Sequence, residues 1–174
     1  MKLKKLTGAA ILSGLSIALM YLLRIPMPGA PFLEYDMADI PILIGTFAYG
    51  PLAGFAMTLV VSVIQGVTVS AASSWYGIVM HVLATGSFVL TAGNLYQGNH
   101  TKKGAGIALA FGSLVQVIVM FFANLLITPF YMGMEVRAVL SFMPIIMLFN
   151  VLRVIINSAV TFVTYKGVRH VLPK

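Results

Sequence analysis

The chain contains no cysteine, and only four of its 174 residues are acidic. The lack of cysteine excludes disulfide frameworks, thiolate metal sites and cysteine nucleophiles. Charged residues of both signs make up 9% of the sequence, whereas soluble domains carry about 25%. Together with a hydrophobic content of 60% and a mean hydropathy of +1.00, this low charge predicts an integral membrane protein.

Three further absences narrow the function. No GxxxxGK[ST] sequence is present, so this chain is not expected to hydrolyse ATP through a P-loop. No second histidine or carboxylate lies at metal-binding distance in sequence from His81, so we expect no metal site and no cofactor. The net charge of +7 comes from basic residues at the ends of apolar segments, a pattern that indicates membrane topology and argues against nucleic-acid binding.

The apolar segments predict an all-α membrane domain of six transmembrane helices that spans residues 1–174. The first apolar segment is longer than a typical signal-peptide core, and we expect it to be retained as a span. Gly50-Pro51 separates the second helix from the third, Pro129 is expected to close the fifth, and the sixth is expected to begin near Pro144. The expected ranges are roughly 6–23, 38–49, 51–67, 75–96, 105–127 and 144–168.

The charges separate between the two predicted sides of the membrane. With six spans, one side holds eight of the eleven basic residues: Lys2, Lys4, Lys5, Lys102, Lys103, Lys166, Arg169 and Lys174. The other side holds Arg24, Arg137 and all four acids: Glu34, Asp36, Asp39 and Glu135. The positive-inside rule makes the basic side cytoplasmic, so we expect both termini in the cytoplasm and the acids at the outer mouth.

The last two predicted helices carry the polar groups most suggestive of a site. Arg153 lies in the middle of an apolar segment, where a charge is costly and marks a functional hypothesis. Asn150 and Asn157 lie one turn before and one turn after it, on the same face. Asn124 shares a face of the fifth helix with Met120 and Gln116, with Thr128 above them. The alternative is that these groups only hydrogen-bond neighbouring helices.

Three other features have competing interpretations. Ala10, Gly14 and Ala18 form a small-xxx-small stripe that suits close helix packing, either within this chain or against a partner. His81 is included among the candidate lining residues, although a lone membrane histidine is typical of packing. Asp36 and Asp39 have the spacing of an acid/base pair, but no nucleophile accompanies them, and Asp39 is expected to cap the second helix.

At this point the sequence resembles a known family. The string FLEYDMADIPILIGTFAYGPLAG is similar to the first loop and second helix of substrate-binding S components of energy-coupling factor (ECF) vitamin transporters, and most similar to the riboflavin-specific branch. GIVMHVLATGSFVLTAGNLY, ANLLITPF and LFNVLRVIINS agree with later helices of that family, in the same order. The resemblance covers nearly the whole chain.

The resemblance implies a six-helix protein in the bacterial cell membrane that captures its vitamin from outside with high affinity. It further implies that the first loop, with Glu34, Asp36 and Asp39, gates the site, and that the substrate is riboflavin or its phosphate. The expected partners are the lipid bilayer, a membrane coupling subunit and two ATP-binding-cassette ATPases. The docking face implied for the coupling subunit is the stripe of Ala10, Gly14 and Ala18.

The resemblance also implies which side chains contact the ligand. The family's polar contacts fall on Asn124, Asn150 and Arg153. Lysine is expected where Arg153 stands, and arginine keeps the charge but offers a planar fork of donors. Asparagine can both donate to and accept from the pyrimidine-like edge of a flavin. The apolar and aromatic walls of the site are expected to come from Phe32, Leu33, Tyr35, Met120 and Tyr131. The remaining candidates for the site are Thr128 and His81.

Three other functions remain open from the sequence. The same fold could serve another vitamin, such as pantothenate or folate, although a carboxylate substrate would favour more positive charge at the outer mouth. An integral membrane enzyme could use Asp36 and Asp39. A structural subunit without a ligand would use Asn124, Asn150 and Arg153 only to brace its helices.

Overall fold

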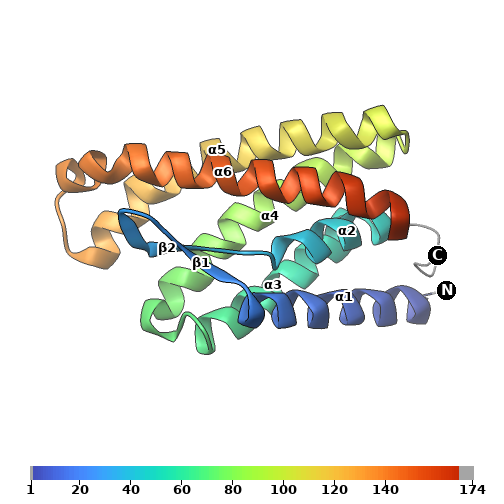
Figure 1. Ribbon diagram of the computed structural model, residues 1–174, viewed down its shortest axis with the longest axis horizontal. Helices are drawn as coiled ribbons and strands as arrows, with labels where there is room; N and C mark the ends of the chain where they lie inside the picture. The colour runs from blue at the N-terminus through green and yellow to red at the C-terminus, as the bar shows by residue number, and fades with distance from the viewer. Residues whose placement is uncertain (1, 169–174) are drawn as a thin grey trace.

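The computed structural model describes residues 2–168, and within them the chain is almost entirely helical. Figure 1 shows long helices that lie side by side and one short β-hairpin laid across them. The predicted all-α class is therefore confirmed. The elements are α1 (Lys2–Leu22), β1 (Arg24–Met27), β2 (Ala30–Asp36), α2 (Asp39–Tyr49), α3 (Pro51–Val67), a short 3₁₀ turn (Ala71–Ser73), α4 (Ser74–Gly98), α5 (Lys102–Met132) and α6 (Val136–Val168).

Four of these helices are long and apolar enough to cross a bilayer: Leu3–Leu22, Trp75–Gly98, Lys102–Met132 and Val136–Tyr165. The helices α2 and α3 are shorter, with 11 and 17 residues. At 1.5 Å per residue, α2 is about 16 Å long, which is roughly half the thickness of a hydrocarbon core. This apolar, helical architecture is that of a multi-pass membrane protein.

The connections gather at two opposite ends of the molecule. In Figure 1 the start of α1, the end of α6 and the α4–α5 loop lie at one end, and the hairpin, the 3₁₀ turn and the α5–α6 loop lie at the other. The starts of α1 and α5, at the first end, contain Lys4, Lys5, Lys102 and Lys103, and the hairpin, toward the second end, contains Arg24 and Glu34. Arg169 and Lys174, which the sequence also assigned to the basic side, lie outside the described residues.

The helices α2 and α3 form a tight helical hairpin. Gly50 joins them with φ 101°, a conformation that favours glycine. A side chain on Gly93 of α4 would lie 2.7 Å from Cβ of Pro51 and 2.8 Å from Cγ2 of Thr46, so α4 approaches both helices closely there. Because α2 is short and ends at the basic end, it begins deep within the helix bundle (Figure 1).

The β-hairpin occupies the segment that the sequence treated as a plain loop. β1 and β2 pair antiparallel, with Arg24 opposite Asp36 and Tyr35 opposite Ile25. Gly29 supplies the turn with φ 83°. The second strand leads directly to the start of α2, so the hairpin delivers Asp36 to the interior.

The two last helices are longer than their prolines suggested. The sequence placed the end of the fifth helix near 127 and the start of the sixth near 144, but α5 continues through Pro129 to Met132 and α6 begins at Val136. Membrane helices tolerate internal proline because their neighbours can satisfy the freed backbone groups. α5 instead ends at Gly133, which adopts the left-handed conformation with φ 61°.

Candidate functional site

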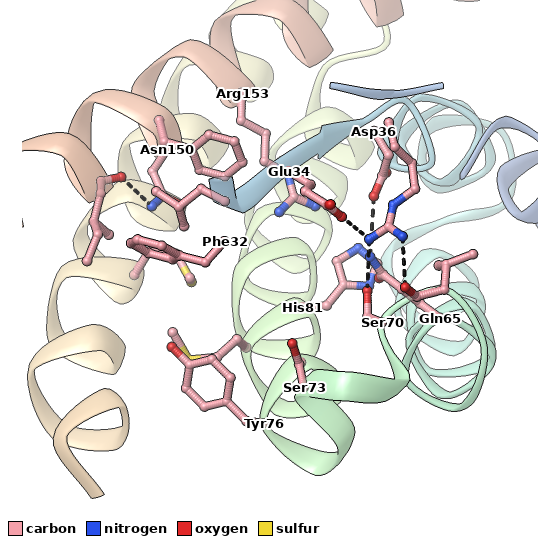
Figure 2. A pocket seen from close by; sticks show the side chains of 18 of the residues that line it. Phe32, Glu34, Asp36, Gln65, Ser70, Ser73, Tyr76, His81, Asn150 and Arg153 are labelled. Carbon is pink, nitrogen blue, oxygen red and sulfur yellow. Dashed lines mark hydrogen bonds and ion pairs between the residues drawn. The ribbon is translucent and has the colours of Figure 1, made fainter. Parts of the chain in front are cut away.

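A cavity of about 420 Å³ lies beneath the β-hairpin, a volume within the range of small-molecule sites. Its walls come from the hairpin, the end of α3, and the facing sides of α4, α5 and α6. Figure 2 shows Asn150 and Phe32 on one side of the cavity and Gln65 and Ser70 on the other. The lining includes these candidates from the sequence: Asn124, Asn150, Arg153, Phe32, Leu33, Met120, His81, Glu34 and Asp36.

The two asparagines on α5 and α6 are held in matching ways. Nδ2 of Asn124 donates to the Met120 carbonyl at 2.8 Å, and Nδ2 of Asn150 donates to the Ile146 carbonyl at 2.8 Å. Oδ1 of Asn124 also accepts from the Thr128 hydroxyl at 3.1 Å. Both residues are buried, at 4% and 2% exposure. These bonds fix the amide planes, so each asparagine presents a preset polar edge to the cavity.

A second, more apolar cavity of about 300 Å³ adjoins the first and shares six lining residues with it: Phe32, Leu33, Ser73, Tyr76, Asn124 and Ile146. Thr128 and Tyr131, two further candidates, line the second cavity and not the first. Its other walls are Met132, Met134, Val139 and Phe142. The rings of Tyr76 and Tyr131 stack at a centroid distance of 4.2 Å. The joined space can therefore hold a ligand with one polar and one apolar end.

Asp39 is the centre of a buried polar network below the first cavity. Its Oδ2 accepts from Nε of Arg153 at 3.0 Å and pairs with Nη2 of the same residue at 2.8 Å. The same oxygen accepts from Nδ2 of Asn157 at 2.8 Å. Its Oδ1 accepts from the Thr85 hydroxyl at 2.7 Å and bonds Nε2 of His81 at 3.1 Å.

This network corrects two predictions about the acids. Asp39 was expected in the outer loop as the cap of the second helix, but it is the first residue of α2, is fully buried, and makes no capping bond. The cost of burying Arg153 is offset by this carboxylate, which lies on a neighbouring helix. Asp36 instead fixes the start of α2, because its Oδ1 accepts from the Ala38 N–H at 2.9 Å.

Tyr35 was expected to form part of the wall, but the structure does not place it in the lining of either cavity. Its hydroxyl donates to Oδ1 of Asn157 at 2.9 Å, which ties the hairpin to α6 and, through Asn157, to Asp39. Burial, with a smaller contribution from nearby Asp39, raises the pKa of Tyr35 to about 12. The phenol therefore keeps its proton at neutral pH and remains a donor.

The hairpin is also held across the mouth of the cavity. Arg24 forms an ion pair with Glu34 on the opposite strand. Its Nη1 donates to the Val69 carbonyl at 2.7 Å, and its Nη2 contacts the Ser70 hydroxyl at 3.4 Å. One arginine thus joins both strands to the segment that follows α3.

The sequence reasoning missed the contribution of α3 to the site. Gln65 lines the first cavity, and its Nε2 donates to Oδ2 of Asp36 at 3.3 Å. A glutamine near the end of an otherwise apolar helix was the available signal. The sequence pattern predicted α3 only as a short membrane span, so Gln65 was not among the candidate site residues.

The small-residue stripe on α1 faces outward. Ala10, Gly14 and Ala18 are all exposed, and a side chain placed on Gly14 would meet no atom within 4 Å. The alternative that the stripe packs against another helix of the same chain is therefore not what the structure has. Exposed apolar side chains flank it, including Ile11 and Leu15.

Comparison with known proteins agrees with this architecture. A family model described as "ECF transporter, substrate-specific component" matches residues 4–165. The chain belongs to this family. It is therefore a transporter component, and the expectation drawn from the sequence resemblance is confirmed. The matched residues include most of α1, all of α2 to α5 and most of α6.

Individual relatives of this ECF component carry more specific names. The "Riboflavin transporter FmnP" of Bacillus subtilis (strain 168) is 36% identical over 134 residues, which cover 75% of this chain and 70% of that protein. The "Riboflavin transporter RibU" of Staphylococcus aureus (strain TCH60) is 26% identical over 179 residues, covering 98% and 93%. A solved structure described as "Structure and mechanism of the S component of a bacterial ECF transporter" has a TM-score of 0.84 and 28% identity, with both chains fully covered.

Proposed function

We propose that this S component binds riboflavin from the outside of the cell and delivers it to the energy-coupling part of an ECF importer. The observation that carries the proposal is the cavity beneath the hairpin, which places the fixed amides of Asn124 and Asn150 beside aromatic and apolar walls. Relatives named as riboflavin transporters support the choice of vitamin.

The chemistry of the cavity suits a flavin. An isoalloxazine ring is a flat apolar slab with donors and acceptors on its pyrimidine-like edge, so it needs both apolar walls and amide partners. Phe32, Met120 and Tyr76 supply such walls around Asn124 and Asn150. The apolar end of the ring would extend into the adjoining second cavity, and the polar edge would meet the two asparagines.

The competing functions receive less support. Pantothenate and folate carry carboxylates, which would favour a free cation in the site, but the guanidinium groups of Arg153 and Arg24 are already paired with Asp39 and Glu34. An enzyme that used Asp36 and Asp39 would need a reactive carboxylate, whereas both oxygens of Asp39 are engaged by other side chains. A purely structural role for these side chains would not account for a cavity of about 420 Å³ beside them.

Delivery requires partners, and the exposed stripe on α1 is the surface that we assign to the coupling subunit. Close approach of two membrane helices depends on small residues such as Ala10, Gly14 and Ala18. The two ATPases of the importer would then supply the energy, because no P-loop is present in this chain.

We further propose that all six helices lie in the bilayer with both termini in the cytoplasm. The basic residues at one end of the molecule support this orientation. The natural lack of cysteine makes a test simple. Lys103→Cys should resist a membrane-impermeant maleimide in intact cells, and Glu135→Cys should react. The reverse pattern would contradict the orientation.

The nature of the ligand can be tested on the purified protein. Protein expressed in riboflavin-replete cells should be yellow and absorb near-ultraviolet and blue light. Mass spectrometry of the small molecules released by denaturation should identify riboflavin. A colourless preparation that releases pantothenate or folate would replace the proposal with one of the alternatives.

A further inference from the structure

A serine on α3, Ser62, joins the buried network around Asp39 through the imidazole of His81. The Ser62 hydroxyl lies 2.9 Å from Nδ1 of His81 and 2.6 Å from the Thr58 carbonyl oxygen. The other ring nitrogen, Nε2, lies 3.1 Å from Oδ1 of Asp39. Ser62 and Asp39 are fully buried, and His81 is 4% exposed. Both ring nitrogens therefore have a partner inside the protein, and the hydrogens that these bonds require can be counted.

The bonds at His81 and Ser62 cannot all form at once with a neutral imidazole. Asp39 is paired with Arg153, and an ionised carboxylate only accepts, so Nε2 of His81 must donate. The Ser62 hydroxyl has one hydrogen, and if it points to the Thr58 carbonyl, Nδ1 of His81 must donate to Oγ. Both ring nitrogens then carry hydrogen, which makes the imidazole a cation. A neutral imidazole with its hydrogen on Nε2 keeps its bond to Ser62 only if the hydroxyl turns from Thr58 to Nδ1.

The buried charges around His81 balance when its imidazole is charged. Asp36 on β2 and Asp39 on α2 bring two buried carboxylates. Arg153 pairs with Asp39, whereas Asp36 bonds a backbone N–H and the amide of Gln65. We call Asp36, Asp39, His81 and Arg153 the charge cluster. With a charged imidazole it holds two positive and two negative groups, and with a neutral imidazole it has one excess negative charge, which is costly inside a protein.

The other groups near the imidazole leave this balance unchanged. Arg24 and Glu34 also line the cavity and form an ion pair with each other. The phenols of Tyr35 and Tyr76 are neutral near pH 7, as tyrosines ordinarily are. The residues that α5 contributes to the cavity are uncharged: Met120 and Asn124. A change in the net charge near neutral pH therefore falls on the imidazole.

The imidazole of His81 is in a position to exchange protons with the solution. His81 lines the cavity (Figure 2), so solvent that fills the cavity reaches the ring. Histidine is the side chain that ordinarily changes its charge between about pH 5 and 8. Arg153 lines the same cavity and shares Asp39 with His81, so the loss of a proton from the ring makes the cavity wall more negative.

We propose that His81 and Ser62 form a proton switch that ties ligand binding to the pH of the compartment that the cavity faces. With the proton bound, the Ser62 hydroxyl points to Thr58 and the charge cluster is neutral. Without it, the hydroxyl turns to Nδ1 of His81 and the cluster carries one excess negative charge. Ser62 is a positioning residue, because it acts on the cavity only through His81.

The first test observes the imidazole directly, on ligand-free protein. The chain has three histidines, and His100→Gln combined with His170→Gln leaves His81 alone. Nitrogen NMR of isotope-labelled histidine distinguishes the doubly protonated ring from each of the two neutral tautomers. Between about pH 5 and 8 the His81 ring should pass from doubly protonated to neutral with its hydrogen on Nε2. A ring that keeps one state throughout this range, or a neutral ring with its hydrogen on Nδ1, would overturn the proposal.

A serine variant tests the part played by the hydroxyl. Ser62→Ala removes the acceptor for Nδ1–H of His81, and a hydrogen bond to a charged group is stronger than one between neutral groups. The midpoint of the His81 transition should therefore move to lower pH by about one unit. Ser87→Ala is the matched control, because Ser87 is on the same helix and its hydroxyl donates to the Ala84 carbonyl, so the midpoint should stay in place. Equal midpoints in the two variants would remove Ser62 from the switch.

The link to binding rests on the proposed function and is measured separately, by quenching of riboflavin fluorescence. The flavin edge is rich in acceptors, so the riboflavin dissociation constant of the wild type should rise as the pH rises through the same range. His81→Gln keeps a donor for Asp39 but cannot change its charge, and should give a flat pH profile. A variant that follows the wild-type profile would refute the link between His81 and binding. If riboflavin binds at no pH, the proposed function and this link both fail, whereas the NMR titration decides on the proton switch by itself.

Discussion

Neutralising Asp39 is the perturbation that tests the buried network most sharply. Asp39 is fully buried and accepts from Arg153, Asn157 and Thr85, in addition to its bond with His81. In Asp39→Asn the guanidinium of Arg153 remains inside the protein without its ion-pair partner. Breaking a buried ion pair by removing one partner costs about 3–5 kcal/mol. For a chain of this size, that corresponds to a fall in Tm of roughly 6–20 °C.

The assay is thermal unfolding of the purified protein in detergent, without flavin. Glu135→Gln provides the matched control because it also neutralises an acid, but at an exposed position between α5 and α6. Surface substitutions of this kind stay within about 0.5 kcal/mol, so its Tm should remain close to that of the wild type.

A double variant separates the ion pair from other effects of the substitution. Asp39→Asn combined with Arg153→Gln removes both charges, and replacing a whole buried pair is far less costly than breaking it. The double variant should therefore be more stable than Asp39→Asn alone. If Asp39→Asn unfolds at the wild-type temperature, or if the second substitution lowers Tm further, the two charges are not coupled and the reasoning is refuted.

Three other substitutions test separate parts of the account. Asn150→Ala should weaken riboflavin binding by about 1–3 kcal/mol, or about 5- to 150-fold. The control Asn94→Ala, which removes an exposed amide that also bonds a carbonyl four residues earlier, should leave riboflavin binding unchanged. If both variants bind riboflavin with the same affinity, Asn150 is not part of the site. Gly14→Leu should abolish riboflavin uptake in cells but leave riboflavin binding and Tm unchanged, because a side chain at this position meets no atom within 4 Å. If uptake survives, the α1 stripe of Ala10, Gly14 and Ala18 is not the docking face. Gly93→Ala should destabilise the fold by about 1–3 kcal/mol because the new Cβ would press on the backbone of Pro51. Thermal unfolding measures this against the control Gly98→Ala, where the new Cβ would have open space. Identical Tm values for the two variants would contradict the close packing of α4 on the α2–α3 hairpin.

Much of the architecture could be predicted from composition because apolar runs and terminal charges directly reflect the bilayer. The β-hairpin was missed, although Pro28-Gly29 is a turn signal between two short extended segments. The ends of α5 and α6 were misplaced because proline stops helices far more reliably in water than in a membrane protein. Both errors concern the end of the molecule at which the cavity lies.

The candidate site could be predicted only in part. Asn124 and Asn150 stood out because polar residues are rare in apolar helices, and the structure places both on one cavity. The partner of Arg153 was not identified, although a mid-membrane arginine requires a countercharge and the chain has only four acids. Choosing Asp39 among them depends on the depth at which α2 begins, which in turn depends on how the hairpin enters the bundle. No local sequence pattern encodes that tertiary arrangement.

The central claim is that the cavity beneath the hairpin holds one riboflavin. Titration of ligand-free protein with riboflavin, followed by flavin fluorescence, tests it most directly. The account predicts saturable quenching with a stoichiometry of one, and a weaker affinity in Asn150→Ala under the same conditions. Riboflavin fluorescence that stays unquenched by folded wild-type protein would contradict the account.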